Sequence, residues 1–329
     1  MKVLIVRVSS LGDVVHNMPM VADILRHHPG AVIDWVVEEA YRDLVRLNTG
    51  VRRIIPFALR RWRRSLLSTA TRAEITAFRR ALREEEYDIV FDTQGLFKSG
   101  LVMGMARTVR GGKKVGLANG TEGSGYEGIS RIFHDISVPV GVHTHAVERA
   151  RIVAAHGLGH AIDTPADFLL APPQLQPAWL PDKPYAVFFH GTARAAKQWS
   201  PDHWVRVAAF LARRGLPVLL PWGSEEERYA AEAMAARMGN ATVLPRLPMM
   251  EAVLLAQRCA LAVGVDTGLT HIAAAYCRPT VELYVDSPRW KTEGNWSPAV
   301  INLGDSGLPP SPELVEQAIV QLLGNSTPS

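Results

Sequence analysis

The amino-acid sequence predicts an α/β protein of two doubly wound, Rossmann-like domains that face a cleft. Apolar runs of strand length alternate with segments of helical period along most of the chain, which is the βαβα order of a parallel sheet. One proline-rich stretch interrupts this order near the middle. The length of 329 residues also exceeds the roughly 250 to 300 residues at which a single hydrophobic core stops growing. We therefore expect two domains, each with its own core.

The first half contains four strand-and-helix pairs. The opening run, residues 2–8, is apolar apart from Lys2 and Arg7 and is too short for a signal peptide, so we interpret it as a buried strand. Each later strand is also a short apolar run, and each is followed by a segment with apolar residues at helical spacing. The pairs are residues 2–8 and 14–27, 32–37 and 39–47, 53–57 and 72–86, and 88–92 and 96–107.

The domain boundary is expected at residues 171–184, which contain five prolines and no periodicity, as in a stiff linker. The first domain would then span residues 1–170 and the second residues 185–308. A last helix at 311–323, within the terminal segment 309–329, can pack on either domain, and the sequence does not choose. In the second domain we expect strands at 185–190, 217–221, 242–244, 260–265 and 279–284, and helices at 201–214, 225–238, 249–257 and 269–276.

Composition and charge describe an ordinary globular chain with a basic first half. Hydrophobic residues make up 47% and charged residues 21%, which excludes a disordered or collagen-like protein. Cys259 and Cys277 are expected to be reduced in a cytoplasmic protein, and no apolar stretch approaches the roughly 18 residues of a membrane span. The net charge of +4 divides into +6 for residues 1–165 and −2 for residues 166–329.

The positive charge is concentrated between Asp43 and Glu74, where arginines occur without an acidic residue. This stretch indicates a polyanionic partner, or simply a solvated helix face. Trp62 amid arginines would suit base stacking, but no nucleic-acid-binding module accompanies it, so we expect no nucleic acid partner. The arginines are Arg46, Arg52, Arg53, Arg60, Arg61, Arg63, Arg64 and Arg72.

Loops that follow the strands are the candidate binding sites, because ligands of open α/β sheets bind beyond the carboxyl ends of the strands. In residues 9–16, Asp13 stands where a helix is expected to begin, either as a helix cap or as a catalytic carboxylate. In residues 91–99, Asp92 and Gln94 can bind substrate hydroxyls or cap the following helix. Neither loop decides between its two interpretations.

The second half offers three further loops. Residues 265–271 follow a strand and start a helix whose free amides suit a diphosphate, with His271 either on a phosphate or structural. In residues 189–199, Lys197 is a cation suited to diphosphate oxygens, although an ordinary exposed loop is the simpler interpretation. Glu225, near the next helix start, can bind ribose hydroxyls or serve only the helix dipole.

Other chemistries have little support. Residues 123–128 match Gly-x-Gly-x-x-Gly, but a polar stretch precedes them where a dinucleotide fingerprint requires a strand, which leaves a nicotinamide-dependent oxidoreductase as a weak rival. The chain has no Asp-x-Asp, His-Glu-x-x-His, Cys-x-x-Cys or P-loop motif, and His143 and His145 have no third ligand nearby in sequence. We expect neither a metal nor an organic cofactor.

Several of these segments occur in the same order in the lipopolysaccharide heptosyltransferases of glycosyltransferase family 9, and the resemblance spans nearly the whole chain. It is greatest to the heptosyltransferase I group, which uses ADP-L-glycero-β-D-manno-heptose as donor and the Kdo of Kdo-lipid A as acceptor. The segments are residues 9–13 (Ser-Ser-Leu-Gly-Asp), 60–64 (Arg-Arg-Trp-Arg-Arg), 92–95 (Asp-Thr-Gln-Gly), 145–149 (His-Ala-Val-Glu-Arg), 192–197 and 266–271.

The resemblance implies a GT-B glycosyltransferase fold, with the acceptor on the N-terminal domain and the ADP-sugar mainly on the C-terminal domain. It implies Asp13 as the catalytic base that takes the proton of the acceptor hydroxyl. The implied donor-binding residues are Thr192, Ala193, Lys197, Glu225 or Glu226, Leu247, Asp266, Thr267, Gly268 and His271. The implied acceptor-binding residues are Ser10, Gly12, Arg60, Arg61, Arg63, Arg64, Asp92, Gln94, Lys98 and His145.

Two positions depart from the family pattern. The chain has Thr192-Ala193 where the family has adjacent threonines, which removes one hydroxyl contact. It has Leu247 where the family has a methionine on the adenine, which keeps an apolar wall.

The implied function is inverting, metal-independent heptose transfer to Kdo-lipid A by a monomer that lies peripherally on the cytoplasmic face of the inner membrane. There the arginines of residues 52–64 would meet anionic lipid. Lys197 and the helix start at 267–269 would stabilise the departing ADP. Two alternatives remain, a related heptosyltransferase with another core acceptor and a protein that binds a nucleotide sugar or an anionic lipid without turnover.

Overall fold

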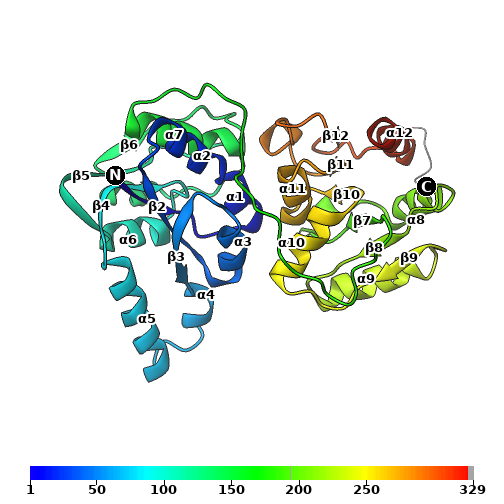
Figure 1. The fold of residues 1–329 in the computed structure, drawn as a ribbon, viewed down its shortest axis with the longest axis horizontal. Helices are drawn as coiled ribbons and strands as arrows, with labels where there is room; N and C mark the ends of the chain where they lie inside the picture. Colours follow the sequence, from blue (N-terminus) through cyan, green and yellow to red (C-terminus); the bar gives the residue numbers. More distant parts are fainter. Residues whose placement is uncertain (193, 325–329) are drawn as a thin grey trace. The chain divides into compact units, whose positions relative to one another are not determined.

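The computed structural model describes residues 1–192 and 194–324, and the chain divides into two compact units whose boundary lies between Ala171 and Pro172 (Figure 1). Each unit contains one six-stranded sheet. Every pair of neighbouring strands in both sheets is parallel. The predicted α/β class with two doubly wound sheets is therefore confirmed.

The first sheet has the strand order β3-β2-β1-β4-β5-β6. This order runs outward from β1 in both directions, as in doubly wound folds with crossover helices on both faces. The strands are β1 Lys2–Val6, β2 Val32–Glu38, β3 Val51–Phe57, β4 Glu86–Asp92, β5 Arg107–Leu117 and β6 Ile136–Val138. The helices are α1 Leu11–His16, α2 Pro19–His27, α3 Arg42–Arg46, α4 Leu59–Trp62, α5 Thr69–Leu82, α6 Phe97–Met105 and α7 Ala146–Leu158, with 3-10 turns at Glu39–Tyr41 (η1) and Gly128–Phe133 (η2).

The second sheet has the order β12-β11-β10-β7-β8-β9. The strands are β7 Ala186–Phe189, β8 Val218–Leu220, β9 Ala241–Val243, β10 Leu261–Val265, β11 Thr280–Tyr284 and β12 Val300–Gly304. The helices are α8 Pro201–Ala212, α9 Glu225–Ala235, α10 Met249–Arg258, α11 Gly268–Ala275 and α12 Pro312–Leu323, with 3-10 turns at Ala195–Lys197 (η3) and Arg289–Lys291 (η4).

Helices cover both faces of the first sheet. Leu4 and Val90 share one buried cluster with Phe78 of α5 and Val102 of α6, so these two helices pack on one face. On the other face, a Cβ added to Gly157 of α7 would lie 2.7 Å from the ring of Phe91. A side chain at this position would push α7 off the sheet. The central strands β1 and β4 are thus largely buried between helices on both faces, which explains their short continuous apolar runs in the sequence.

Some elements differ from the sequence-based expectations. The expected helix at 14–27 is two helices, because Pro19 lacks the amide hydrogen that a continuous helix would need and instead opens α2. The first of the two begins at Leu11, three residues before the expected start. The sequence analysis missed the short helix α4, the strands β5, β6 and β12, and helix α7. Most of β5 is polar or glycine, so it lacked the apolar run by which strands were recognised.

The structure decides the packing of the last helix, α12, which lies in the second unit. Val315 and Ile319 are buried in the core cluster that also contains Trp204 of α8. On the outside, Arg206 of α8 pairs with Glu313 and with Glu316.

The proline-rich segment lies against the second unit as well, because Trp179 Nε1 donates a hydrogen bond to Glu251 of α10. Residues 171–184 are therefore partly anchored.

Candidate functional site

The loop between β10 and α11 gathers a row of charged side chains in the second unit. Asp266 follows β10, and α11 begins at Gly268 with Thr267 as its N-cap. Lys197 Nζ pairs with Asp266 Oδ2, and His271 Nε2 lies 3.0 Å from Asp266 Oδ1. The fold thus brings together three of the predicted residues, two of which lie 69 positions apart in the chain.

Glu282 of β11 completes this row, and the sequence analysis missed it. Its Oε1 lies 3.0 Å from His271 Nδ1. Its Oε2 accepts hydrogen bonds from Tyr284 Oη at 2.9 Å and from the Gly294 amide at 3.0 Å. The side chain is fully buried. The available signal was an acidic residue inside an apolar strand, since a buried carboxylate requires a charged or hydrogen-bonding partner.

The charged side chains of this row stabilise one another in their ionised forms. Burial alone disfavours a charged imidazole, but Glu282 and Asp266 outweigh burial and raise the pKa of His271 to about 10. Burial likewise disfavours the Asp266 carboxylate, but the hydrogen bond and charge of His271, together with Lys197, hold the pKa of Asp266 well below its usual range. Both groups are therefore charged at neutral pH. Since both ring nitrogens contact carboxylates, this arrangement supports the structural role that the sequence left open for His271.

The start of α11 has the geometry of an anion site. Thr267 and Gly268 are partly exposed, and the first amides of a helix have no partner within the helix. The helix closes tightly onto β10, because a Cβ added to Gly264 would lie 2.1 Å from Thr270 Oγ1. These amides and the Lys197 ammonium, which remains 19% exposed, offer positive charge on the same loop pair.

Two other predicted donor-binding residues are partly buried, and one lies outside the described residues. Thr192 follows β7 and Leu247 lies in the loop between β9 and α10; both side chains are half-buried. Ala193 is the predicted residue that the structure does not describe.

Three glutamates open α9, and the third turns back toward the end of β7. Glu225 and Glu226 are exposed to solvent. Glu227 Oε2 accepts a hydrogen bond from the Gly223 amide at 2.7 Å. Its carboxyl group lies beside Gly191, since a Cβ added there would be 2.5 Å from Glu227 Cδ. Glu227, which the sequence-based choice between Glu225 and Glu226 does not include, is the acid that faces the β7 loop.

The first unit holds Asp13 in a ring of donors. Ser10 is the N-cap of α1, and Asp13 is its third residue rather than the cap. Asp13 Oδ2 accepts from the Ser10 amide at 3.0 Å and from Ser10 Oγ at 2.8 Å. Asp13 Oδ1 pairs with Arg7 and lies 3.5 Å from Arg149 Nη2. Gly12, within the same short helix, is partly exposed.

Two buried guanidinium groups control the charge of Asp13. Burial alone would raise the pKa of Asp13, but Arg7 and Arg149, with the hydrogen bonds from Ser10, lower it below its usual range. Burial and the neighbouring Arg7 lower the pKa of Arg149 to about 10, which still leaves it charged at neutral pH. Arg149 Nη1 also donates to Thr121 Oγ1 at 3.0 Å. Asp13 is thus an ionised, partly exposed carboxylate that helps to cap α1.

Asp92 and Gln94 have structural contacts instead of the expected exposure to an acceptor. Asp92 is fully buried and accepts from the amides of Gln94 and Gly95 and from Ser99 Oγ, at 2.9, 3.1 and 3.0 Å. Burial raises the pKa of Asp92 to about 6. Gln94 is also buried, and its Oε1 accepts from the Val8 amide at 3.0 Å. These contacts support the capping alternative, in which both side chains shape the loop.

Lys98 and His145, two other predicted acceptor-binding residues, have different surroundings. Lys98 is half-buried, donates to Ser9 Oγ at 3.2 Å, and has its pKa lowered by burial and by the nearby Arg60 and Arg63. It therefore belongs to a basic cluster beside the Asp13 loop. His145 is the N-cap of α7, and its Nδ1 accepts from the Val147 amide at 3.2 Å. The expectation of acceptor contact thus keeps its support at Lys98, whereas His145 serves the helix.

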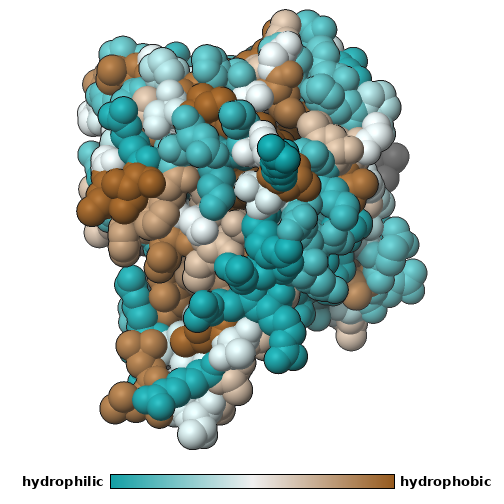
Figure 2. Space-filling view, turned by 90° about the vertical axis from the view of Figure 1, so that its left-hand side faces the viewer, coloured by the Kyte–Doolittle hydropathy of each residue, from teal (hydrophilic) through white to brown (hydrophobic). Residues whose placement is uncertain are grey.

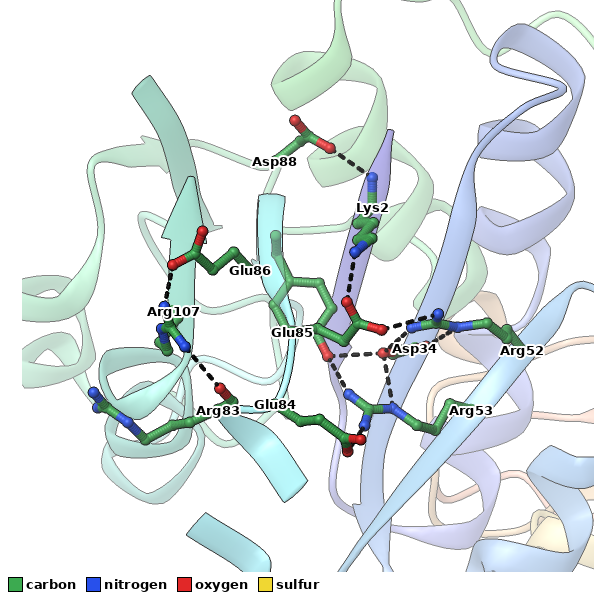
Figure 3. Close-up of polar contacts among 11 residues, drawn as sticks. Lys2, Asp34, Arg52, Arg53, Arg83, Glu84, Glu85, Glu86, Asp88 and Arg107 are labelled. Atoms are coloured by element: carbon green, nitrogen blue, oxygen red, sulfur yellow. Dashed lines mark hydrogen bonds and ion pairs between the residues drawn. The ribbon is translucent and has the colours of Figure 1, made fainter. Parts of the chain in front are cut away.

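The arginine-rich stretch splits into two groups with different surroundings. Arg52 and Arg53 both pair with the buried Asp34 at the amino ends of the strands, in a network that includes Glu84 and Glu85 (Figure 3). These two arginines hold the sheet together and correct the expectation that the whole stretch 52–64 faces a polyanion.

The second arginine group surrounds α4. Arg61 pairs with Glu39 and Glu74, so its charge is largely neutralised. Arg60, Arg63 and Arg64 are exposed, and no ion pair joins them to an acidic residue in the described part of the chain. The positive charge available to a ligand therefore lies at this end of the stretch.

Residues 1–192 and 194–324 contain no cluster of three or more His, Cys, Asp or Glu side chains arranged to hold a metal ion. The same residues contain no helix long and apolar enough to span a membrane.

Comparison with known proteins identifies the family. Residues 75–323 match the model of glycosyltransferase family 9 (heptosyltransferase). Lipopolysaccharide heptosyltransferase 1 of Pseudomonas aeruginosa is 41% identical over 287 residues, covering 86% of this chain and 78% of that protein. The enzyme of the same name from Escherichia coli K12 is 37% identical over 286 residues, covering 86% of this chain and 88% of that protein.

A solved structure agrees with these relatives. E. coli heptosyltransferase WaaC with ADP superposes with a TM-score of 0.85 at 32% sequence identity, covering 98% of this chain and all of the other. Because the family model and these relatives match most of its length, the chain belongs to glycosyltransferase family 9 and is a heptosyltransferase.

Proposed function

We propose that this heptosyltransferase transfers L-glycero-D-manno-heptose from ADP-heptose to the Kdo of Kdo-lipid A, inverting the anomeric carbon without a metal ion. The donor is supported by the likeness to WaaC with ADP and with ADP-2-deoxy-2-fluoro heptose, at TM-scores of 0.85 and 0.79. The acceptor is supported by the greater identity to heptosyltransferase 1 of E. coli, 37%, than to heptosyltransferase 2 of the same strain, 27%.

The donor diphosphate would bind at the start of α11. Thr267 and Gly268 provide amides and Thr192 a hydroxyl, while Lys197 provides a cation whose position Asp266 controls. As the bond from the anomeric carbon to the diphosphate breaks, negative charge grows on the departing ADP, and preorganised donors of this kind stabilise it. Lys197 thus supplies the charge that a metal ion supplies in other transferases.

The nucleoside end of the donor would lie along the loops that follow β7, β8 and β9. Glu227 faces Gly191 and Gly223, so we assign the ribose hydroxyls to Glu227 in place of Glu225 or Glu226. Leu247, which is half-buried, would form the apolar wall for the adenine.

Asp13 would act as the general base of the transfer reaction. Inverting transfer needs one carboxylate to take the proton of the acceptor hydroxyl while its oxygen attacks the anomeric carbon and ADP leaves. The contact that supports this role is the pairing of Asp13 with Arg7 and Arg149, which keeps the carboxylate ionised. Both arginines also lower its proton affinity. An anionic acceptor would offset their charge on binding, so the base gains proton affinity only when the acceptor is present.

The acceptor would bind through the basic cluster of Lys98, Arg60, Arg63 and Arg64. Kdo-lipid A carries carboxylate and phosphate groups, and the exposed arginines and the half-buried lysine offer the complementary charge. The same charge supports peripheral contact with the anionic cytoplasmic face of the inner membrane, where each basic group contributes about 1 kcal/mol.

The test is transfer from ADP-L-glycero-β-D-manno-heptose to deacylated Kdo-lipid A in the presence of a chelator, following ADP release, the acceptor mass and the anomeric configuration of the product. ADP together with an acceptor carrying one inverted heptose supports the proposal. ADP release without the mass gain means another acceptor. Donor binding without ADP release means a binding protein without turnover.

The variant Asp13→Asn separates the base from the binding site. It should keep ADP affinity and lose at least ~10²-fold in kcat, because the amide cannot accept the proton. An active variant would overturn the assignment of the base.

A further inference from the structure

The turn between α4 and α5 exposes two adjacent leucines. Leu66 is 54% exposed and Leu67 is 85% exposed, the largest value among the exposed large hydrophobic side chains in the described residues. Figure 1 shows α4 and α5 extending away from the rest of the first unit, and Figure 2 shows hydrophobic side chains at the lower end of the same projection. Single exposed apolar residues are common in proteins, whereas a pair at the tip of a projection points to a contact surface.

The turn is held in a defined shape beneath these leucines. Trp62 is buried, packs edge-on against Phe57 and Phe78 with ring centres 5.4 and 5.6 Å away, and donates a hydrogen bond to Glu74 at 2.8 Å. Ser65 Oγ and Thr71 Oγ1 lie 2.8 Å apart across the turn. Phe57, Trp62 and Phe78 pack against one another below the turn and give the exposed leucines a fixed base.

The charge around the leucines is positive. Arg63, Arg64 and Arg72 are exposed, and the structure records no ion pair for them within the described residues. Glu74 is occupied by Arg61 and Trp62. A second copy of this surface would bring the same charge and be repelled, whereas a bilayer with anionic headgroups offers both the apolar interior and the complementary charge.

We propose that residues 63–68 form a membrane-inserting loop, in which Leu66 and Leu67 enter the acyl boundary of an anionic bilayer while Arg63, Arg64 and Arg72 contact lipid phosphates. This inference rests on the proposed function, because it assigns residues to the peripheral membrane contact. Apolar insertion and basic contacts together would give stable peripheral attachment, because either signal alone gives only marginal, reversible binding. The loop adjoins Arg60, so insertion would bring a lipid-borne acceptor to the basic cluster.

The first experiment measures sedimentation of the full chain with vesicles of phosphatidylglycerol and phosphatidylethanolamine, compared with vesicles of phosphatidylcholine alone. We expect the wild type to bind the anionic vesicles, and this binding should weaken as salt is added. In the double variant Leu66→Ser, Leu67→Ser the partition coefficient should decrease at least about tenfold. The control Leu308→Ser removes a leucine that is 70% exposed in the second unit and should bind like the wild type. Equal binding of the double variant overturns the proposal.

Activity on the water-soluble deacylated acceptor distinguishes this inference from the proposed function. The double variant should keep the wild-type rate there, because its leucines lie outside the proposed catalytic and binding residues. Loss of vesicle binding with this rate intact supports the loop. No transfer by the wild type defeats the proposed function, while the vesicle result still decides whether the loop binds lipid.

The second experiment reports insertion directly. Cys277 is exposed and Cys259 is buried, so a Cys277→Ser background accepts an environment-sensitive fluorophore at Leu67→Cys. We expect a blue-shifted emission on anionic vesicles for this label and none for a label at Leu308→Cys. An unchanged spectrum overturns insertion. Insertion is also overturned if sedimentation velocity shows that the double variant Leu66→Ser, Leu67→Ser loses self-association while its vesicle binding is unaffected.

Discussion

The buried charge row of the second unit makes a quantitative prediction about stability. Glu282→Gln keeps the size of the side chain and removes one negative charge from the pair with His271, which is 3.0 Å away. The imidazole would then be left with Asp266 as its remaining carboxylate contact in the row. We expect the second unit to lose stability, because a buried cation loses one of the two groups that compensate its desolvation.

The pKa of His271 sets the size of the expected loss in the free energy of unfolding. At pH 7 a pKa of about 10 favours the folded, protonated imidazole by about 4 kcal/mol, since each pKa unit corresponds to roughly 1.4 kcal/mol. Removing one partner of a buried ion pair costs a similar ~3 to 5 kcal/mol. Because Asp266 contributes to the same pKa shift, ~4 kcal/mol is the upper limit for Glu282→Gln, and for a unit of this size it corresponds to a decrease in Tm of at most roughly 8 to 16 °C.

The pH dependence has a defined sign. Because folding raises the pKa of His271 from 6.5 to about 10, its contribution to stability is complete below pH 6.5 and is lost as the pH rises toward 10. The wild type should therefore lose stability over this range. In Glu282→Gln the pKa of His271 falls, so the decline should be shallower and should end at lower pH.

Calorimetry of the full chain between pH 6 and 10 measures both effects. The matched control is Glu232→Gln, which makes the same chemical change in an acid of α9 whose side chain is 49% exposed and lies 3.7 Å from Arg228. Surface pairs of this kind contribute ~1 kcal/mol or less. Equal Tm values for Glu282→Gln and Glu232→Gln, with the same pH profile as the wild type, would refute the reasoning.

Three further predictions concern activity. Lys197→Met should raise the KM for ADP-heptose ~10-fold or more in steady-state kinetics, because a charge-assisted contact to the diphosphate is lost, whereas Lys183→Met, an exposed change, should leave it unchanged. Glu227→Gln should weaken ADP binding in calorimetric titration more than Glu225→Gln does; the reverse order would exclude Glu227 as the ribose ligand. Arg149→Gln should raise the pKa of Asp13 and move the acid limb of the kcat/KM profile to higher pH, and Arg149→Lys should restore much of the wild-type profile.

The sequence by itself determined the fold class and located the candidate binding loops, although it did not reveal β5, β6, β12, α4 or α7. Parallel strands that are buried on both faces are continuous apolar runs, so residues 260–265 and 279–284 could be predicted as strands. The strands β10 and β11 lie within these two ranges. Glycine, proline and polar residues mark where such strands end. The loop at 265–271 was therefore located before any contact was known.

Only the tertiary structure decided which charges meet. Asp13 lies 136 positions from Arg149, and no local pattern encodes that distance. The same holds for Arg52 and Arg53, which pair with the buried Asp34, and explains why the arginine-rich stretch looked uniform in sequence. Secondary structure follows from the periodicity of neighbouring residues, whereas ionisation and side-chain direction depend on burial and on partners brought together by folding. The charge on His271 and the orientation of Glu227 are properties of the folded chain for that reason.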